Sequence, residues 1–356
     1  MTPPEIEDPH VRAFRTHAAY LRAWRVLALT DSWSPLDDQL DLLAARAAAA
    51  LPPAGDLVEA DEAVWGCLHR AWGTERILTT TRSYAQDPDV VRLANSWGAV
   101  QAYYALYGAA QAVLVSAGGK RPEQHEATQK QYIALWVSRS FDLSPWTFGL
   151  GAPGKRPGDA AGFCGTAGKL VDPNSVHPWS NFSASDAWHV AGAALKGTRQ
   201  DKCKTAANKA RGRKLAQQKK DWKAEEVERQ AQGKPARKEK SWPARANLIQ
   251  AESRAVAQAV RPVSMMDYLY RLRIKANYED AAMYSDGPDG DDAAGAFLAD
   301  LEALTSANLL VHEIRLARVV GKQALLSAAD QWLGKNSSNG PGGGLASRRE
   351  LLANHA

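Results

Sequence analysis

Apolar residues recur at helical spacing along most of the chain, and no segment shows the alternating pattern of a strand. The pattern predicts apolar-faced helices over residues 10–29, 37–51, 60–70, 88–116, 125–140, 265–283 and 293–332. More polar helices are predicted over 185–194, 196–229 and 244–260. Because helices without strand partners must bury their apolar faces against one another, we expect an all-α fold.

Proline and glycine residues near the helix ends support several of these boundaries. Pro88 suits the first position of a helix, and the Gly118-Gly119 pair is typical of a helix end. Residues 142–185 contain many Gly and Pro and predict a loop that is long enough to be functional or mobile. The Gly-rich residues 336–356 predict a flexible tail.

The charge of the chain is unevenly distributed. Residues 196–261 contain 19 Lys and Arg and 7 Asp and Glu, a net of +12, whereas the rest contains 25 basic and 32 acidic residues, a net of −7. Segregation of this kind indicates an electrostatic partner, and a nucleic acid, RNA or DNA, is the first candidate. A solvated helix and a helix that docks on an acidic protein remain alternatives.

The basic segment has few apolar anchors, so its helix is expected to be solvated or laid on a partner. Its Lys and Arg would neutralise phosphates, while Trp222 and Trp242 could stack on bases. The residues predicted to bind nucleic acid are Lys204, Lys209, Arg211, Arg213, Lys214, Lys219, Lys220, Trp222 and Lys223.

Several classes of protein are disfavoured. The three cysteines, Cys67, Cys164 and Cys203, are scattered and odd in number, which argues against a disulfide framework and a cysteine zinc site. We expect no metal and no cofactor. The N-terminus lacks the apolar run of a secretory signal, and the apolar stretch near residues 100–117 is interrupted by polar residues. These features predict a cytoplasmic protein with no membrane span.

Two stretches carry a family resemblance. The first is the Asn95–Leu114 segment NSWGAVQAYYALYGAAQAVL, followed by GKRPEQH, which ends at His125; the second is YLYRLRIKANYED, from Tyr268 to Asp280. In this order they resemble the HEPN superfamily of helical nucleotide-binding and ribonuclease domains. The resemblance assigns 1–85 to an N-terminal helical region and 86–335 to a HEPN-like bundle interrupted by 142–261.

The resemblance implies an up-and-down helical bundle, commonly a homodimer, with metal-independent endoribonuclease activity. Catalytic members carry an Arg followed after four to six residues by a His, in which the Arg stabilises phosphate charge and the His transfers a proton. In this chain Asn277 and Tyr278 stand where such a His would follow Arg271 or Arg273.

Site roles follow from the resemblance. Arg273 would stabilise the phosphate, Asn277 and Tyr278 would orient the scissile group, Asp280 would fix the Arg, and His125 would be the acid or base. Helical spacing predicts that Arg273, Asn277 and Asp280 share one face.

The tyrosines Tyr103, Tyr104 and Tyr107 are expected to pack within the bundle or to stack on bases. The leading function is an RNA-binding protein of bacterial defence or toxin–antitoxin type, and the resemblance leaves open whether it also cleaves RNA. The alternative is a non-catalytic nucleic-acid-binding or assembly subunit of a larger complex.

Overall fold

The structure, a computed structural model, describes residues 8–29, 34–53, 55–84, 87–137, 141–151, 184–237, 243–336 and 344–356. Twelve α-helices dominate these residues, so the predicted all-α class is confirmed. The helices are α1 (Pro9–Leu29), α2 (Leu36–Ala50), α3 (Glu62–Tyr84), α4 (Pro88–Ser116), α5 (His125–Tyr132), α6 (Ala184–Ala231), α7 (Gln250–Ala259), α8 (Met265–Ile274), α9 (Ala282–Ser285), α10 (Asp291–Val320), α11 (Lys322–Asn336) and α12 (Leu345–His355). Two short strands, β1 (Gly149–Leu150) and β2 (Val263–Ser264), form an antiparallel pair.

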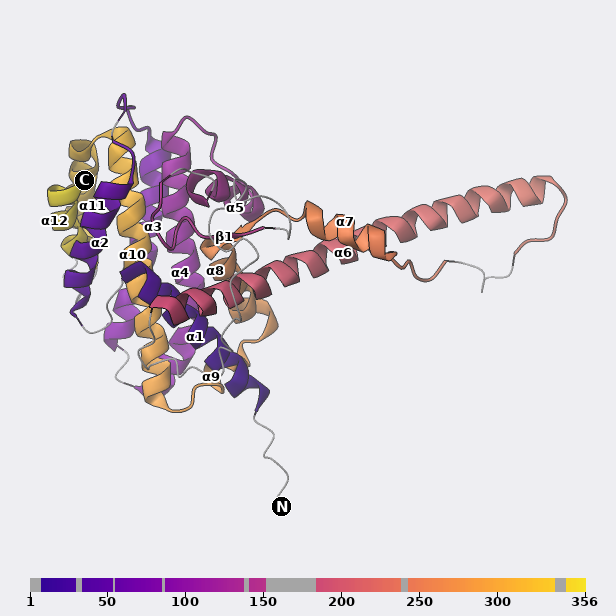
Figure 1. Cartoon of the computed structure of the whole chain (residues 1–356), viewed down its shortest axis with the longest axis horizontal. Coiled ribbons are helices and arrows are strands. Elements are labelled where there is room, and N and C mark those ends of the chain that lie inside the picture. Colours follow the sequence, from indigo (N-terminus) through magenta and orange to yellow (C-terminus); the bar gives the residue numbers. More distant parts are fainter. Residues whose placement is uncertain are drawn as a thin grey trace, which may run out of the picture.

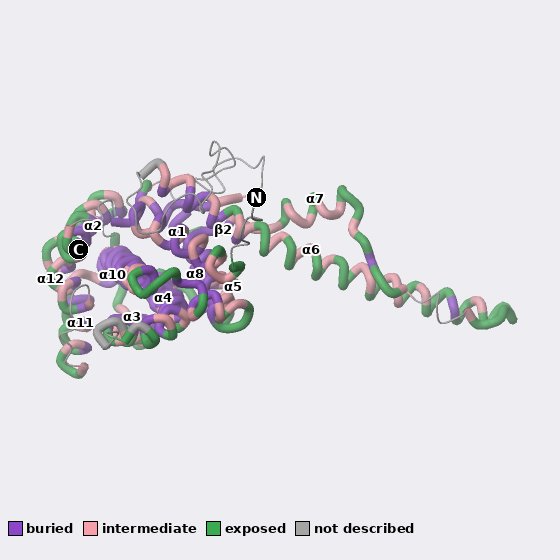
Figure 2. Tube along the Cα trace, turned by 90° about the horizontal axis from the view of Figure 1, so that it is seen from below, coloured by how far each residue is buried: buried purple, intermediate pink, exposed green. Residues whose placement is uncertain are grey.

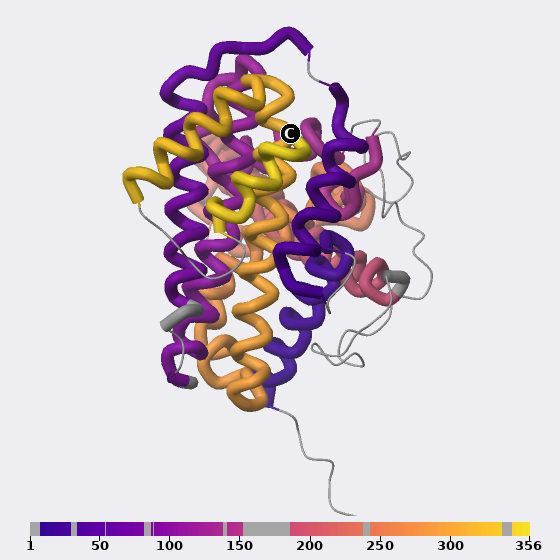
Figure 3. The backbone as a smooth tube through the Cα atoms, turned by 90° about the vertical axis from the view of Figure 1, so that its left-hand side faces the viewer, coloured from indigo at the N-terminus to yellow at the C-terminus, as the bar shows by residue number. Residues whose placement is uncertain are grey.

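The bundle is built around α4 and α10, which pack on each other, while α3 packs along α4 (Figures 1 and 3). Asp87 caps α4 by accepting a hydrogen bond from the Asp89 N–H at 3.0 Å, and Pro88 follows at the first helical position. The helix ends before Gly118, whose φ of 79° favours glycine. Both predicted boundaries of this helix are therefore confirmed.

Close packing of α3 on α4 depends on a glycine. A Cβ atom at Gly108 would lie 3.0 Å from the Cys67 carbonyl oxygen and 3.1 Å from the Ala71 Cβ atom. Neither neighbour is the end of a flexible side chain, so a larger residue would force the helices apart.

The central helix α10 is buried over most of its length. Among the described residues it alone is long and apolar enough to cross a membrane, and 83% of its apolar window is buried inside the fold. Its position at the centre of the bundle accounts for this composition, because a helix surrounded by other helices is apolar on every face.

The first helices join the same core as the rest of the bundle. Phe14 of α1 packs on Phe297 of α10, with ring centres 5.2 Å apart. The carboxylate of Asp300 on α10 lies 3.2 Å from Nε of Arg22 and 3.0 Å from Nη1 of Arg25. Within the described residues, 1–85 therefore has no core separate from that of 86–335.

The basic segment forms an arm. α6 begins against α1, with Val190 and Leu195 buried, and then extends away from the bundle (Figures 1 and 2). The two helices predicted over 185–194 and 196–229 are one continuous helix of 48 residues. The chain returns without regular structure over 243–249, and α7 lies along α6. The helix predicted over 244–260 is therefore shorter than expected.

Two predictions for the C-terminal part are wrong. The helix predicted over 293–332 is divided at Gly321, where φ is 90°. The end of the predicted flexible tail is the packed helix α12, in which Arg348 and Leu352 are fully buried. Arg348 contacts two buried carboxylates on other helices, and composition alone could not reveal these distant partners.

The loop predicted over 142–185 lies largely outside the described residues. Its described part, 142–151, includes β1. The helix predicted over 265–283 is divided into α8, the π-helical turn η5 (Lys275–Glu279) and α9.

Candidate functional site

Arg273, near the end of α8, lies among tyrosine rings. Its guanidinium carbon Cζ is 5.1 Å from the ring centre of Tyr104, 5.6 Å from that of Tyr270 and 5.8 Å from that of Tyr103. Tyr103 and Tyr104 belong to α4, and Tyr270 belongs to α8. The electron-rich ring faces attract the cation, which stabilises its burial.

The guanidinium of Arg273 meets no carboxylate in the part of the chain that the structure describes. Only 8% of the residue is exposed, and its Nε is buried without a hydrogen-bond partner. Among the described residues, no hydrogen bond or ion pair involves the side chain of Arg273. A buried cation is usually paired with an anion because desolvation is costly. The arrangement therefore leaves a cation that a bound anion could neutralise.

His125 lies beside this cation at the first position of α5. Its Nδ1 is 2.8 Å from the Tyr103 hydroxyl oxygen, and its ring centre is 4.9 Å from that of Tyr107 and 5.4 Å from that of Tyr270. Burial, and then the positive charge of Arg273, lower the pKa of His125 below its usual value. Its imidazole is therefore neutral at neutral pH and able to accept a proton.

Tyr103 is fully buried, and burial raises the pKa of its phenol far above the usual value. The phenol therefore stays protonated and can hold His125 in place through their hydrogen bond. The structure thus brings together Arg273 and His125, two of the five residues predicted to be catalytic.

The other three do not join this cluster. Tyr278 is 72% exposed and Asn277 is also exposed. Asp280 accepts a hydrogen bond from Nδ1 of His10 at 3.2 Å, so the predicted Asp280–Arg273 pair is wrong. The wider turn η5 intervenes between Arg273 and Asp280, and helical spacing of 100° per residue no longer applies there.

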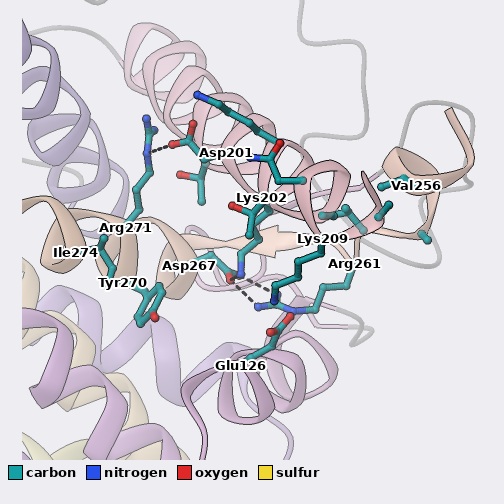
Figure 4. A pocket seen from close by; sticks show the side chains of 18 of the residues that line it. Glu126, Asp201, Lys202, Lys209, Val256, Arg261, Asp267, Tyr270, Arg271 and Ile274 are labelled. Carbon is teal, nitrogen blue, oxygen red and sulfur yellow. Dashed lines mark hydrogen bonds and ion pairs between the residues drawn. The ribbon is translucent and has the colours of Figure 1, made fainter. Parts of the chain in front are cut away.

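A cationic groove runs from the cluster along the base of the arm (Figure 4). It lies between α5, α8 and the paired helices α6 and α7, and Tyr270 belongs to both the cluster and the groove. Its lining includes nine basic and five acidic side chains. The basic ones are Lys130, Lys202, Lys204, Lys209, Arg213, Lys214, Arg261, Arg271 and Lys275, and the acidic ones are Glu126, Asp201, Glu252, Asp267 and Glu279.

Some of these charges hold the arm in place. The buried carboxylate of Asp267 lies 2.7 Å from Nη2 of Arg261 and 3.1 Å from Nζ of Lys202. In addition, Nζ of Lys214 on α6 is 2.8 Å from the Glu252 carboxylate on α7. These contacts tie the two helices of the arm to each other and to α8.

Other cations of the groove have no partner among the described residues. The basic lining residues whose side chains form no ion pair or hydrogen bond there are Lys130, Lys204, Lys209, Arg213 and Lys275. Among the acidic residues that line the groove, Glu126 and Glu279 form no ion pair with a described residue. The groove therefore offers an excess of free cations.

The predicted nucleic-acid-binding residues divide into two sets. Lys204, Lys209, Arg213 and Lys214 line the groove, whereas Arg211, Lys219, Lys220, Trp222 and Lys223 lie outside it on α6. The indole of Trp222 is half-buried, with Cζ of Arg237 5.9 Å from its ring centre. Arg237 therefore already lies against that ring, and Trp242 lies outside the described residues.

Sequence reasoning missed Tyr270, Lys130 and Arg261 as members of the site. The sequence carries no local signal for their place in the site: Tyr270 packs on Tyr103 of α4, and Arg261 is held by Asp267 of α8 and Gln129 of α5. No group of His, Cys, Asp and Glu in the described residues has the arrangement of a metal site. Comparison with known proteins finds no family model, no curated protein and no solved structure that matches this chain.

Proposed function

We propose that this protein binds nucleic acid in the groove at the base of its arm. The observation that carries the proposal is a group of cations on one wall of the groove, represented by Lys204, Lys209 and Arg213, whose side chains have no partner within the described ranges. Phosphates spaced along a nucleic acid would neutralise such cations and release counterions, which supplies sequence-independent affinity.

The shape of the arm supports the proposal. At 1.5 Å per residue the 48 residues of α6 form a helix about 70 Å long, and its outer half has little apolar surface to bury. Val227, for example, is 68% exposed. A long, polar and basic helix suits a partner whose negative charges are spread along its length, as the phosphates of a nucleic acid are.

We further propose that the partner is RNA and that Arg273 and His125 cleave it, as the resemblance to HEPN ribonucleases implies. Neutral His125 would accept the proton of a ribose 2′-hydroxyl, and that oxygen would attack the adjacent phosphorus while the bond from phosphorus to the 5′ oxygen of the next nucleotide breaks. The products would be a 2′,3′-cyclic phosphate and a 5′-hydroxyl, whose proton comes from the His125 imidazolium or from water. Arg273 would stabilise the negative charge that develops on the phosphate oxygens. This chemistry needs no metal.

A non-catalytic nucleic-acid-binding subunit is the second candidate. It is favoured by the position of Asn277 and Tyr278, which are exposed and outside the cluster, and by the deep burial of Arg273. In this case Arg273 would bind a phosphate of the nucleic acid and would take no part in cleavage.

Binding is tested by measuring affinity for labelled RNA between about 50 and 200 mM salt. We expect affinity to fall steeply with salt and the Lys204→Gln/Lys209→Gln variant to bind more weakly. For this variant the plot of log affinity against log salt concentration should be less steep by about 1.4, because two phosphate contacts to a single strand are lost. The charge-matched control is Lys322→Gln/Lys335→Gln on α11, which should behave as the wild type. Affinity that is independent of salt would contradict the proposal.

Cleavage is tested by incubating the protein with labelled RNA in EDTA and comparing wild type, Arg273→Ala and His125→Ala. Cleavage by the wild type that both variants lose supports the ribonuclease. Binding without cleavage by any of the three supports the non-catalytic subunit.

A further inference from the structure

The cationic groove ends at a cluster of aromatic side chains that reach the surface. Tyr104 is 37% exposed, and Tyr107, His125 and Tyr270 are half-buried, whereas Tyr103 beneath them is fully buried. Neighbouring ring centres are between 4.9 and 6.3 Å apart. Tyr270 lines the groove and also contacts Arg273, so the two features are continuous.

Core packing accounts for only part of this cluster. Tyr103 belongs to the core, and Tyr107 and Tyr270 pack partly against it. Tyr104 instead lies at the surface beside Arg273, a cation with no acidic partner among the described residues. An exposed ring next to an unpaired buried guanidinium can offer two contacts at once, a face for a planar group and a charge for an anion.

We infer that the groove takes a single-stranded nucleic acid, with one base against the Tyr104–Tyr270 surface and a phosphate of that strand at Arg273. The inference rests on the proposed nucleic-acid binding and deepens it. A nucleotide in a single strand can turn its base away from its phosphates and onto a ring. A duplex holds the faces of its bases in its own stack and presents mainly phosphates, so it can use the free cations but not the rings.

The order of the contacts follows from the geometry. Lys204, Lys209 and Arg213 lie on the α6 wall of the groove, and Tyr270 lies on the α8 wall beside Arg273 (Figure 4 labels Lys209 and Tyr270). The strand would run along the cations and end or bend at the tyrosines. Because every base has a planar face, this contact selects single-strandedness rather than sequence.

The test compares four labelled oligonucleotides of about 12 nucleotides, which is within the range of known single-strand sites. They are a single-stranded RNA, a single-stranded DNA, the duplex of the same sequence and a fully abasic strand of equal charge. We expect the RNA or DNA single strand to bind about 10-fold more tightly than the duplex and the abasic strand, as one base–ring stack contributes. Comparing the RNA single strand with the DNA single strand shows which sugar the protein prefers.

Variants locate the contact on the protein. Tyr104→Leu should bind the single strand about as weakly as wild type binds the abasic strand, and should leave abasic binding unchanged. Tyr104→Phe, which keeps the ring, should restore the preference. Trp97→Leu is the matched control, because Trp97 is a 63% exposed aromatic residue two turns away on the same helix.

Each result separates the two proposals. Equal affinity for the single strand, the duplex and the abasic strand would overturn the single-strand inference while leaving salt-dependent binding intact. A preference for the single strand that Tyr104→Leu retains would also overturn it. Failure of all four oligonucleotides to bind would overturn the proposed function itself.

Discussion

The hydroxyl oxygen of Tyr103 lies 2.8 Å from Nδ1 of His125, so the middle of α4 is joined to the start of α5 within a ring cluster that also holds Arg273. The phenol stays protonated because burial raises its pKa. The imidazole is neutral because burial and the Arg273 charge lower its pKa. The pair is therefore fixed in position, and the charge near it is carried by Arg273.

The pKa of His125 should respond to Arg273. In Arg273→Gln we expect this pKa to rise, because the positive charge that disfavours the imidazolium is removed, but to stay below the usual value because the burial remains. NMR titration of the His125 ring measures the shift. Arg271→Gln is the control: it removes an equal charge that lies 2.5 Å from Asp201 on α6. An unchanged pKa in Arg273→Gln would contradict the arrangement.

His312 should make the protein sensitive to acid. It is buried on α10, where Nδ1 lies 2.7 Å from the Asn308 carbonyl oxygen and Nε2 accepts a hydrogen bond from Nε1 of Trp136 at 3.1 Å. Burial is the main cause that lowers its pKa to about 3. Between pH 6.5 and about 3 the unfolded chain therefore binds a proton that the folded protein does not.

This difference means that His312 does not disfavour the fold above pH 6.5, where it is neutral in both states, and that the fold loses stability as the pH falls from 6.5 toward 3. The free energy of unfolding should decrease by up to about 1.4 kcal/mol per pH unit from this group. Urea unfolding of wild type and His312→Gln across this range measures it. The difference between the two proteins should shrink as the pH falls, and a constant difference would contradict the assignment.

Arg348 should be essential for the packing of α12. Its guanidinium is fully buried and contacts Glu75 of α3 and Glu313 of α10, and Trp72 donates a hydrogen bond to Glu313 at 2.7 Å. Arg348→Met leaves two buried carboxylates without their cation, so we expect a loss of about 3–5 kcal/mol in the free energy of unfolding. The neighbouring variant Arg349→Met breaks only an exposed pair with Asp330, which solvent screens, and should leave the free energy of unfolding nearly unchanged. Denaturant unfolding distinguishes the two.

Gly321 should be required at the junction of α10 and α11. Its φ of 90° and ψ of 138° lie in a region that residues with a Cβ rarely adopt. We therefore expect Gly321→Ala to destabilise the protein by about 1–3 kcal/mol. Gly334→Ala is the control within α11, where a Cβ meets nothing within 4 Å, and it should be neutral or stabilising. Thermal unfolding of both variants checks the contrast.

Much of the fold could be predicted because its signals are local. Asp87 and Pro88 begin α4 and Gly118 ends it through groups within a few residues of each boundary. The charge of the arm is equally visible, since Lys and Arg follow one another along α6. These features need only neighbours in the chain, and the sequence determined them: an all-α protein, the main helix boundaries and a basic segment.

The partners of individual side chains depended on packing. Asp280 was expected near Arg273, but η5 widens the helix and the carboxylate meets His10, 270 residues earlier. Arg348 was expected in a flexible tail, but its guanidinium forms ion pairs with two buried glutamates. No pattern of neighbouring residues predicts such pairs. They form only when helices that are distant in the chain pack together and exclude water.

The sequence by itself determined the helical class and the excess of positive charge on residues 196–261. Only the tertiary structure placed Tyr270 and Arg273 against Tyr103 and His125, and turned the basic segment into a groove with free cations. The physical reason is that helix formation and charge are properties of neighbouring residues, whereas burial of the Arg273 cation among rings requires α4 and α8 to pack together.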